Sequence, residues 1–98
     1  MTALTPVKIT SELKDVPGWT HRAKTIVRTF KLDAFRVSVA FVRRIAKRAE
    51  KFQHHPDIDI RFDKVTLTFT THDAGALTAK DFSMARECDK IFANFLEP

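Results

Sequence analysis

The stretch DIDIRFDKVTLTF, residues 57–69, alternates apolar and polar side chains along almost its whole length. The apolar positions are Ile58, Ile60 and Phe62 in the first half and Val65, Leu67 and Phe69 in the second. Successive side chains of a strand point to opposite faces, so this pattern predicts a hairpin with one apolar face. We expect strands from Asp57 to Phe62 and from Val65 onward, with the turn at Asp63 and Lys64. The polar face of the second strand carries Thr66, Thr68 and Thr70.

A long helix is predicted immediately before the hairpin, from Leu32 to Phe52, with Asp33 as its N-cap. One apolar face recurs at three- and four-residue steps and consists of Phe35, Val39, Val42, Ala46 and Ala49. Basic residues crowd its last turns, where they complement the helix dipole. Pro56 indicates that the helix has ended before it.

Further upstream, residues 10–15 predict a short helix capped by Thr10 or Ser11, which Pro17 and Gly18 end. Trp19 to Thr25 and Ile26 to Phe30 then predict two short strands.

A last helix is predicted to begin at Thr78, because Thr78 followed by Asp81 has the spacing of a capping box. Its apolar face is expected at Phe82, Ala85, Cys88 or Asp89, Phe92 and Phe95. The order is therefore α-β-β-α-β-β-α. It predicts an α+β fold, in which three helices pack on one face of a four-stranded antiparallel sheet.

Length and composition restrict the function classes. The 98 residues predict a single domain, residues 1–98. Cys88 is the only cysteine and the chain has two glycines, which excludes an intramolecular disulfide, a four-cysteine zinc site and a glycine-rich phosphate loop. The net charge of +5 comes without a nucleic-acid-binding motif, so we predict no nucleic-acid partner. No stretch approaches the ~20 apolar residues of a membrane span, and we expect a soluble, cytoplasmic protein.

Four candidate functional residues fall at the junctions between predicted elements. His54 and His55 follow the long helix, His72 follows the second hairpin, and Asp81 opens the last helix. Histidine gains and loses a proton near neutral pH, so histidines placed around one substrate could act as general acid and base. Dehydration of an alcohol-like carbon needs both steps.

Each candidate also has a purely structural interpretation. His54 would suit a helix C-terminus, Asp81 would serve as the reciprocal cap of its helix, and His72 would be an exposed residue at a strand end. His21 is expected to be exposed and without a role, and Cys88 to lie in the core. A zinc or iron site is a further interpretation. However, adjacent residues on an extended backbone point to opposite sides, so His54 and His55 suit one ion poorly and we predict no metal.

The run EKFQHHPDIDIRFDKVTLTFTTHDAGALTAKD, residues 50–81, resembles the pterin-4a-carbinolamine dehydratases. Their signature sets a charged or His residue, a His-His-Pro type segment, an aromatic, a His or Trp, and an Asp at defined intervals. The matching positions are Glu50, His54, His55, Pro56, Phe62, His72 and Asp81. The segment PGW at 17–19 and Phe30 extend the resemblance upstream over most of the chain. Asp57 and Ile58 depart from it, since family members often carry a bulky aromatic there.

The resemblance implies a hydro-lyase that removes water from 4a-hydroxytetrahydropterin to give quinonoid dihydropterin, without a metal or an organic cofactor. It also implies a homodimer or homotetramer that recycles tetrahydropterin for aromatic amino-acid hydroxylases, chiefly phenylalanine hydroxylase. Some family members act as dimerisation partners for transcription factors, so a non-catalytic scaffold or coactivator is the alternative function.

The same resemblance implies roles for particular residues by position. The implied catalytic residues are His54, His55, His72 and Asp81. The implied pterin contacts are His54, His55, Pro56, Thr71, His72, Asp73 and Ala74. We expect His54 and His72 to exchange the protons and His55 to position the pterin.

Overall fold

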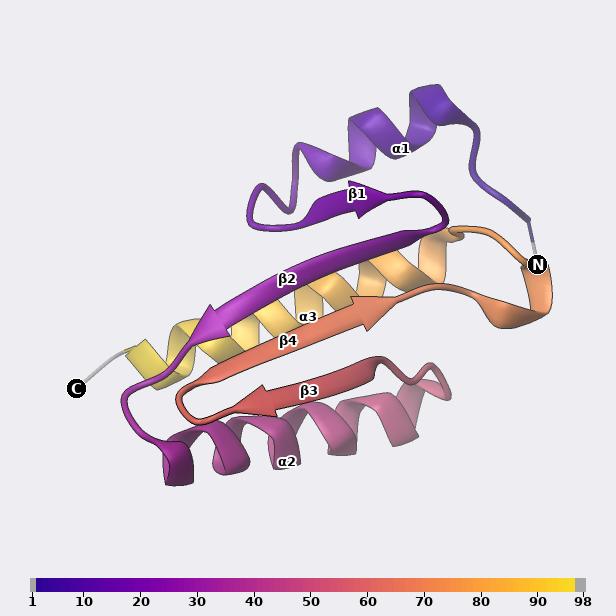
Figure 1. Ribbon diagram of the computed structural model, residues 1–98. Coiled ribbons are helices and arrows are strands. Elements are labelled where there is room, and N and C mark those ends of the chain that lie inside the picture. The colour runs from indigo at the N-terminus through magenta and orange to yellow at the C-terminus, as the bar shows by residue number, and fades with distance from the viewer. Residues whose placement is uncertain (1, 97–98) are drawn as a thin grey trace.

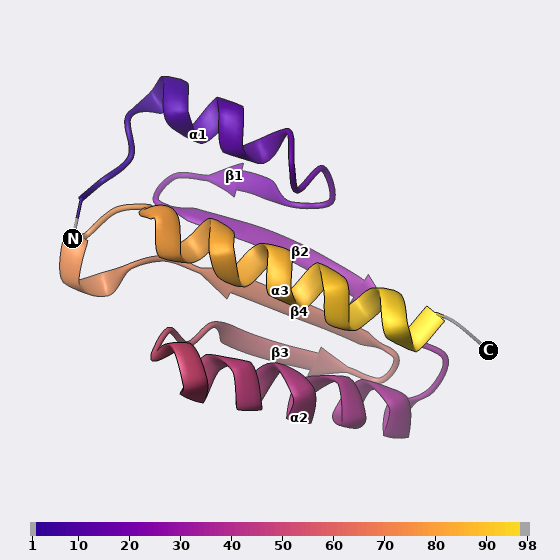
Figure 2. The ribbon, with the colours of Figure 1, turned by 180° about the vertical axis from the view of Figure 1, so that it is seen from behind.

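The computed structural model describes residues 2–96 of the chain. The elements are α1 (Pro6–Leu13), β1 (Thr20–Arg22), β2 (Thr25–Lys31), α2 (Phe35–Phe52), β3 (Asp57–Arg61), β4 (Lys64–Phe69), the short 3-10 helix η1 (His72–Ala74) and α3 (Ala79–Leu96). All strand pairs are antiparallel, in the order β1-β2-β4-β3. Helices α1, α2 and α3 pack on one face of this sheet (Figures 1 and 2). The predicted fold class is confirmed.

The β3–β4 hairpin has the predicted inward parity, with Val65, Leu67 and Phe69 fully buried. The turn lies one residue earlier than predicted, because Arg61 pairs with Lys64 and leaves Phe62 and Asp63 between the strands. Phe62 has a φ of 57°, which a two-residue turn requires to match the twist of the strands. Its side chain therefore leaves the strand pattern and is exposed.

The first hairpin also has a shifted boundary. Arg22 pairs with Thr25, so the turn lies at Ala23 and Lys24, where Ala23 has a φ of 53°. The strands are consequently Thr20–Arg22 and Thr25–Lys31. Trp19, predicted as the first strand residue, precedes the sheet and is buried in the core.

The first helix begins earlier than the sequence suggested. Thr5 is its N-cap, and the Thr5 hydroxyl accepts a hydrogen bond from the Lys8 amide at 3.2 Å. Pro6 occupies the first helical position, where its fixed φ suits the helix and its missing N–H costs nothing. The helix ends at Leu13, and the predicted caps Thr10 and Ser11 lie within it.

The second helix buries only part of the predicted face: Ala49 is buried and Val42 is half-buried, as predicted, but the rest of that face is not. The buried residues of α2 are Ser38, Phe41, Ile45 and Ala49, whereas Phe35, Val39 and Ala46 are exposed. Ser38 can lie inside because its hydroxyl donates to the Ala34 carbonyl at 3.2 Å. The predicted cap was also wrong: α2 starts at Phe35, and Ala34 rather than Asp33 is its N-cap.

The core between sheet and helices is aromatic. The Phe30 ring centroid lies 5.0 Å from the centroids of both Phe41 and Phe92, and the Trp19 ring lies 5.7 Å from Phe69. The predicted inner face of α3 is confirmed at Phe82, Ala85 and Cys88, which are fully buried. None of the helices formed by residues 2–96 has an apolar segment of the length that a membrane crossing requires.

Asp89 joins α3 to the first hairpin through two donors. Its Oδ1 accepts from Trp19 Nε1 at 2.8 Å and from Arg28 Nη1 at 2.7 Å. The Arg28 guanidinium also lies 4.4 Å from the centroid of the Phe30 ring.

Asp89→Ala is expected to lower the free energy of unfolding by about 1–3 kcal/mol, because two partly buried donors lose their acceptor. Urea denaturation measures the change. The matched control is Asp59→Ala, since the ion pair of Asp59 with Arg61 is exposed and such pairs contribute about 0.2–1 kcal/mol. Equal effects of the two substitutions would contradict the role of Asp89.

Cys88 is in the core, as predicted. Burial, and to a smaller extent the neighbouring carboxylates of Asp89 and Glu87, raise the pKa of the Cys88 thiol well above its usual range. The folded protein is therefore expected to resist iodoacetamide at pH 8, because the thiolate is the reactive form. In guanidinium chloride the same thiol should react, and mass spectrometry distinguishes the two states. Rapid labelling of the folded protein would contradict this placement.

Candidate active site

The C-terminus of α2 sends the two adjacent histidines in different directions. Gln53 adopts the left-handed conformation, with φ 52° and ψ 45°, and so ends the helix. The amide of His54 then donates to the Ala49 carbonyl at 3.1 Å. His54 is buried beneath the turn, whereas His55 is exposed and its Nε2 hydrogen-bonds to the Glu50 carboxylate.

The pairing of β3 with β4 brings His72 toward these histidines. Asp57, the first residue of β3, is the partner of Thr68 near the end of β4. Continuing this antiparallel register beyond the sheet places His54 opposite Thr71. The segment that enters β3 therefore runs beside the segment that leaves β4.

The segment after β4 is a tight loop. The backbones of Thr71 and Ala76 form an isolated antiparallel bridge, and η1 lies between them. Gly75 closes η1 with a φ of 62°, in the left-handed region that glycine adopts without strain. Thr71 is buried, while His72 and Asp73 are exposed on the outside of the loop.

Asp81 is fully buried and accepts three hydrogen bonds. His54 Nε2 lies 2.6 Å from Asp81 Oδ1. On the other oxygen, Oδ2, the Thr71 hydroxyl donates at 2.8 Å and the Thr78 amide at 2.9 Å. The last of these is the predicted reciprocal cap of α3, which is confirmed. Asp81 thus fixes the start of α3 and the ring of His54 at the same time.

The His54 ring is further held by stacking and by a complete hydrogen-bond network. It lies parallel to the Phe69 ring, with centroids 5.9 Å apart and an interplanar angle of 9°. The Thr78 hydroxyl lies 2.7 Å from that of Thr71. Within residues 2–96, every buried side-chain nitrogen and oxygen has a hydrogen-bond partner. A network satisfied in this way holds the imidazole in one orientation.

The three histidines line one cavity of about 190 Å³. Its lining consists of Gln53, His54, His55, Thr70, Thr71, His72, Asp73 and Lys80. Five of the seven predicted pterin contacts are among them, but Pro56 and Ala74 are not. Asp81 lies behind His54 and touches the site through it. His21 is exposed and lies in β1, and its Nε2 is 2.7 Å from the Ala23 carbonyl.

Sequence reasoning missed Gln53, Thr70 and Lys80 as lining residues. The first two are chain neighbours of His54 and Thr71, so adjacency was the available signal. Lys80 precedes Asp81 in the chain, but the side of α3 on which the Lys80 side chain lies depends on where the helix starts. Among the residues that the structure describes, no three His, Cys, Asp or Glu side chains gather closely enough to hold a metal ion.

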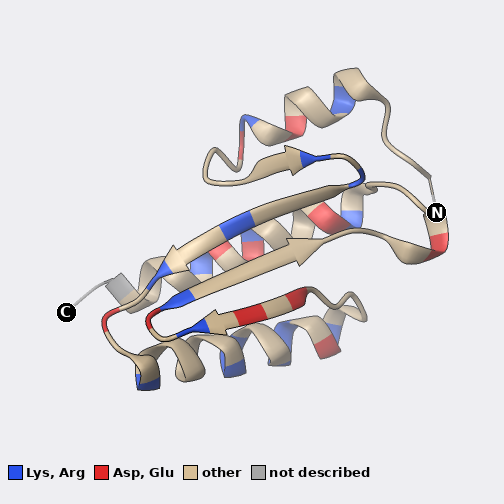
Figure 3. Cartoon of the chain, in the orientation of Figure 1, with Lys and Arg blue, Asp and Glu red and all other residues tan. Residues whose placement is uncertain are grey.

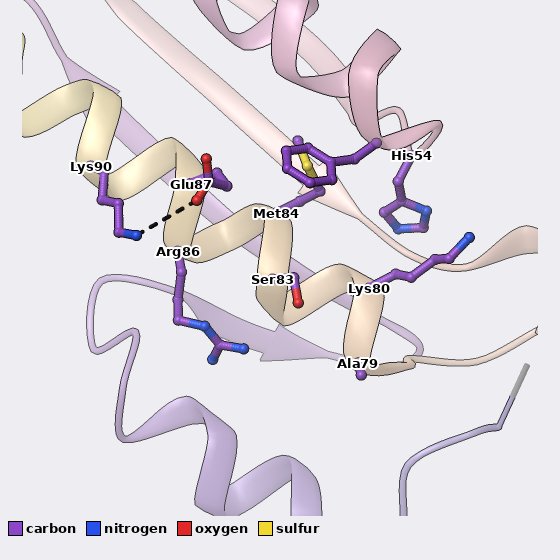
Figure 4. Close-up of a pocket in the computed structure, with 9 residues that line it drawn as sticks. His54, Ala79, Lys80, Ser83, Met84, Arg86, Glu87 and Lys90 are labelled. Atoms are coloured by element: carbon purple, nitrogen blue, oxygen red, sulfur yellow. Dashed lines mark ion pairs between the residues drawn. The ribbon is translucent and has the colours of Figure 1, made fainter.

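A second, larger cavity of about 420 Å³ adjoins the first and shares His54 and Lys80 with it. It runs along α3 and is also lined by Phe52, Ala79, Ser83, Met84, Arg86, Glu87 and Lys90 (Figure 4). No pattern in the sequence predicts this cavity.

Comparisons with known proteins assign the family. Residues 2–91 match the family model described as pterin 4 alpha carbinolamine dehydratase. A protein of Roseiflexus sp. (strain RS-1), provisionally named pterin-4-alpha-carbinolamine dehydratase, is 50% identical over 90 residues, which are 92% of this chain and 97% of that protein. A protein of the same provisional name from Chloroflexus aurantiacus is 47% identical over 91 residues, covering 93% of this chain and 98% of its own.

Two solved structures share the fold. A transcriptional coactivator/pterin dehydratase from Brucella melitensis superposes with a TM-score of 0.88 at 30% identity, over 92% of this chain and 98% of that one. A pterin dehydratase-like protein identified as a RuBisCO assembly factor of the alpha-carboxysome has a TM-score of 0.66 at 19% identity, over 76% of this chain and 89% of its own. The second likeness concerns the fold alone. On the family model and the close relatives together, the chain belongs to the pterin-4-alpha-carbinolamine dehydratase family.

Proposed function

We propose that the protein is a hydro-lyase that removes water from 4a-hydroxytetrahydropterin and releases quinonoid dihydropterin. The observation that carries this proposal is the single cavity lined by His54, His55 and His72. In the reaction the bond between C4a and the hydroxyl oxygen breaks. The hydroxyl takes up one proton and leaves as water, and the adjacent ring nitrogen loses one proton as its double bond to C4a forms.

His54 is the proposed general base. Its Nε2 faces a carboxylate oxygen of Asp81, so Nε2 carries a hydrogen and donates it. In the neutral ring the lone pair is then on Nδ1, which can accept the proton from the ring nitrogen of the pterin. Asp81 would stabilise the imidazolium that results.

His72 is the proposed general acid that delivers a proton to the leaving hydroxyl. It is exposed on η1 and can exchange protons with solvent between turnovers. His55 is the proposed positioning residue, because its Nε2 is already engaged by Glu50 while the ring borders the cavity. Contacts of Pro56 and Ala74 with the pterin stay a prediction.

The proposed chemistry uses no metal and no organic cofactor. Its two proton transfers need only a side chain that accepts a proton and a side chain that donates one, and positioned proton transfer contributes roughly 100- to 10,000-fold. The product would be reduced again for an aromatic amino-acid hydroxylase, such as phenylalanine hydroxylase. We place the protein with that enzyme in the cytoplasm.

The test is the disappearance of a freshly generated 4a-hydroxytetrahydropterin, followed by ultraviolet absorbance. Purified protein is expected to accelerate the loss of water well above the buffer rate, with the same rate after dialysis against EDTA. A rate equal to buffer would overturn the dehydratase assignment. A rate abolished by EDTA and restored by a divalent metal would overturn the metal-free mechanism.

A scaffold role is the second candidate, favoured by the coactivator description of the Brucella melitensis neighbour. A scaffold has no chemical need for three histidines around one cavity. Protein that binds a partner but leaves the 4a-hydroxypterin rate unchanged would favour the scaffold over the enzyme.

Exposed apolar side chains support a homo-oligomer. Phe35 and Val39 on α2 and Ile58 and Ile60 on β3 are each more than a third exposed, and β3 is an edge strand of the sheet beside α2 (Figure 1). A second copy of the chain that covered these four side chains would remove their apolar surface from water.

Light scattering after gel filtration is expected to give the mass of a dimer or tetramer. The double variant Ile58→Lys/Ile60→Lys should shift that mass toward the monomer. The control Val7→Lys replaces an exposed residue of α1 and should leave the mass unchanged. A monomeric mass for the unmodified chain at micromolar concentration would contradict the proposed assembly.

A further inference from the structure

We propose that the larger cavity beside the histidine site is a specificity subsite that binds a long C6 substituent of the pterin, one with an apolar body and a carboxylate end. This inference rests on the proposed function. It assigns residues of α3, outside the histidine cavity, to the choice between substrates.

The two cavities are neighbours. His54 and Lys80 line both of them. A volume of about 190 Å³ for the histidine cavity is small for a ligand site, whereas the adjoining cavity of about 420 Å³ falls within the usual range of roughly 300–1,000 Å³. A substituent that extends from the histidine cavity beyond His54 and Lys80 would reach a space large enough to hold it.

The shape of the larger cavity suits an extended group. Figure 4 shows His54 and Lys80 at one end of it and Lys90 at the other, with Ser83 between them. Lys80 and Lys90 are ten residues apart on one helix, and a helix rises about 1.5 Å per residue, so the cavity follows about 15 Å of α3. A pterin ring bound among the three histidines, with only a short substituent, would leave this length of the larger cavity empty.

The chemistry of the walls indicates what the group should be. Phe52, Ala79 and Met84 supply apolar surface, which suits a flat aromatic body. Among the described residues, three cations line the cavity, Lys80, Arg86 and Lys90, against one carboxylate, that of Glu87. A terminal anion therefore suits the cavity better than a terminal cation.

The existing ion pairs leave part of that positive charge available. Glu87 Oε1 lies 3.5 Å from Arg48, Glu87 Oε2 lies 3.7 Å from Lys90, and Arg86 pairs with Glu12 at 3.0 Å. Within residues 2–96, no carboxylate lies at ion-pair distance from the Lys80 ammonium. At the Lys90 end, two cations, Arg48 and Lys90, share the single Glu87 carboxylate, so one positive charge is left there for the carboxylate of a substrate.

The experiment compares three substituents at C6 of the pterin: a methyl group, a neutral 4-aminobenzamide linked through its amine, and the same group extended by glutamate. Binding of the stable 7,8-dihydro forms is measured by fluorescence titration, and turnover of the 4a-hydroxy forms by absorbance. In the unmodified protein the glutamate compound is expected to bind roughly tenfold more tightly than the methyl compound, a difference of about 1.4 kcal/mol.

Two variants separate charge from space. Lys90→Gln should reduce the preference for the glutamate compound about two- to fivefold, the range of an exposed ion pair, and leave the neutral benzamide preference unchanged. Ser83→Trp should reduce the preference for both long compounds roughly tenfold or more, because the indole fills the middle of the cavity. Lys47→Gln on α2 and Asn94→Trp on α3 are the matched controls, since both positions are exposed and line neither cavity.

The outcomes distinguish this inference from the function on which it rests. Equal binding of the three compounds, or preferences that both variants leave unchanged, would overturn the subsite. Absence of turnover for every compound would overturn the dehydratase assignment, while the binding preferences would still decide the subsite. Thermal melts of each variant check that the fold is retained.

Discussion

His54→Ala is expected to lower kcat/KM for 4a-hydroxytetrahydropterin by roughly 100- to 10,000-fold, because it removes the group proposed to take the proton from the substrate. Stopped-flow absorbance with freshly generated substrate measures the loss. The same change leaves Asp81 Oδ1 without its donor at a buried site, which is expected to cost about 1–3 kcal/mol of unfolding free energy.

The two effects of this substitution can be separated. His54→Gln retains an N–H that can donate toward Asp81 but carries no titrating group, so it should recover stability without recovering rate. His21→Ala is the matched control, because His21 is exposed on β1 and lines neither cavity. Full activity in both His54 variants would show that His54 is not the base.

Asp81→Asn is expected to lower kcat/KM as strongly as His54→Ala does, while leaving the fold nearly intact. Oδ2 accepts from both the Thr71 hydroxyl and the Thr78 amide, so the carbonyl oxygen of asparagine takes that position. Its NH₂ group then faces His54 Nε2 and donates to it. The hydrogen of the imidazole moves to Nδ1, the atom proposed to accept the substrate proton, and the ring is held in the wrong tautomer.

Asp81→Ala is the comparison variant for this prediction. Alanine removes the acceptor of His54, Thr71 and the α3 cap together, at an expected cost of about 1–3 kcal/mol beyond that of asparagine. Urea denaturation and kcat/KM are therefore measured on both variants. Asparagine that keeps full activity, or that destabilises as much as alanine, would contradict the dual role of Asp81.

The β3–β4 hairpin was predictable because its signal was local and unambiguous. Val65, Leu67 and Phe69 alternate with threonines, and only one sheet face accommodates that pattern. The register of this hairpin also determines which segments of the chain meet at the site. Once Asp57 lies opposite Thr68, the chain before β3 and the chain after β4 must run side by side, which brings His54 near Thr71 and His72.

The orientation of α2 was not predictable from periodicity alone, since the helix is apolar on two sides. Phe35 and Val39 form as regular a pattern as Phe41 and Ile45, but the latter pair is buried. The deciding residue is Ser38, a polar side chain that lies inside because it bonds to its own helix backbone at Ala34. The exposed apolar side belongs to the surface proposed for self-association.

The larger cavity depended on three-dimensional placement that the sequence did not specify. Its walls come from the end of α2 and one side of α3, and these helices are adjacent only in the folded protein (Figure 2). Charged residues are scattered over the helices and strands (Figure 3), and nothing in the sequence sets Lys80 and Lys90 apart from the others. These two lysines lie on the same side of α3 because ten residues are nearly three helical turns.

In the proposed mechanism three histidines, distant in the chain, surround one pterin, and histidine-selective ¹⁵N NMR can detect this arrangement. The protein is titrated with a stable 7,8-dihydropterin while the ring nitrogens of each histidine are followed. We expect the ring signals of His54, His55 and His72 to shift with one dissociation constant and that of His21 to stay unchanged. Before pterin is added, His54 should carry its hydrogen on Nε2. Ring signals of His54, His55 and His72 that stay unchanged at saturating pterin, or that shift with separate dissociation constants, would contradict it.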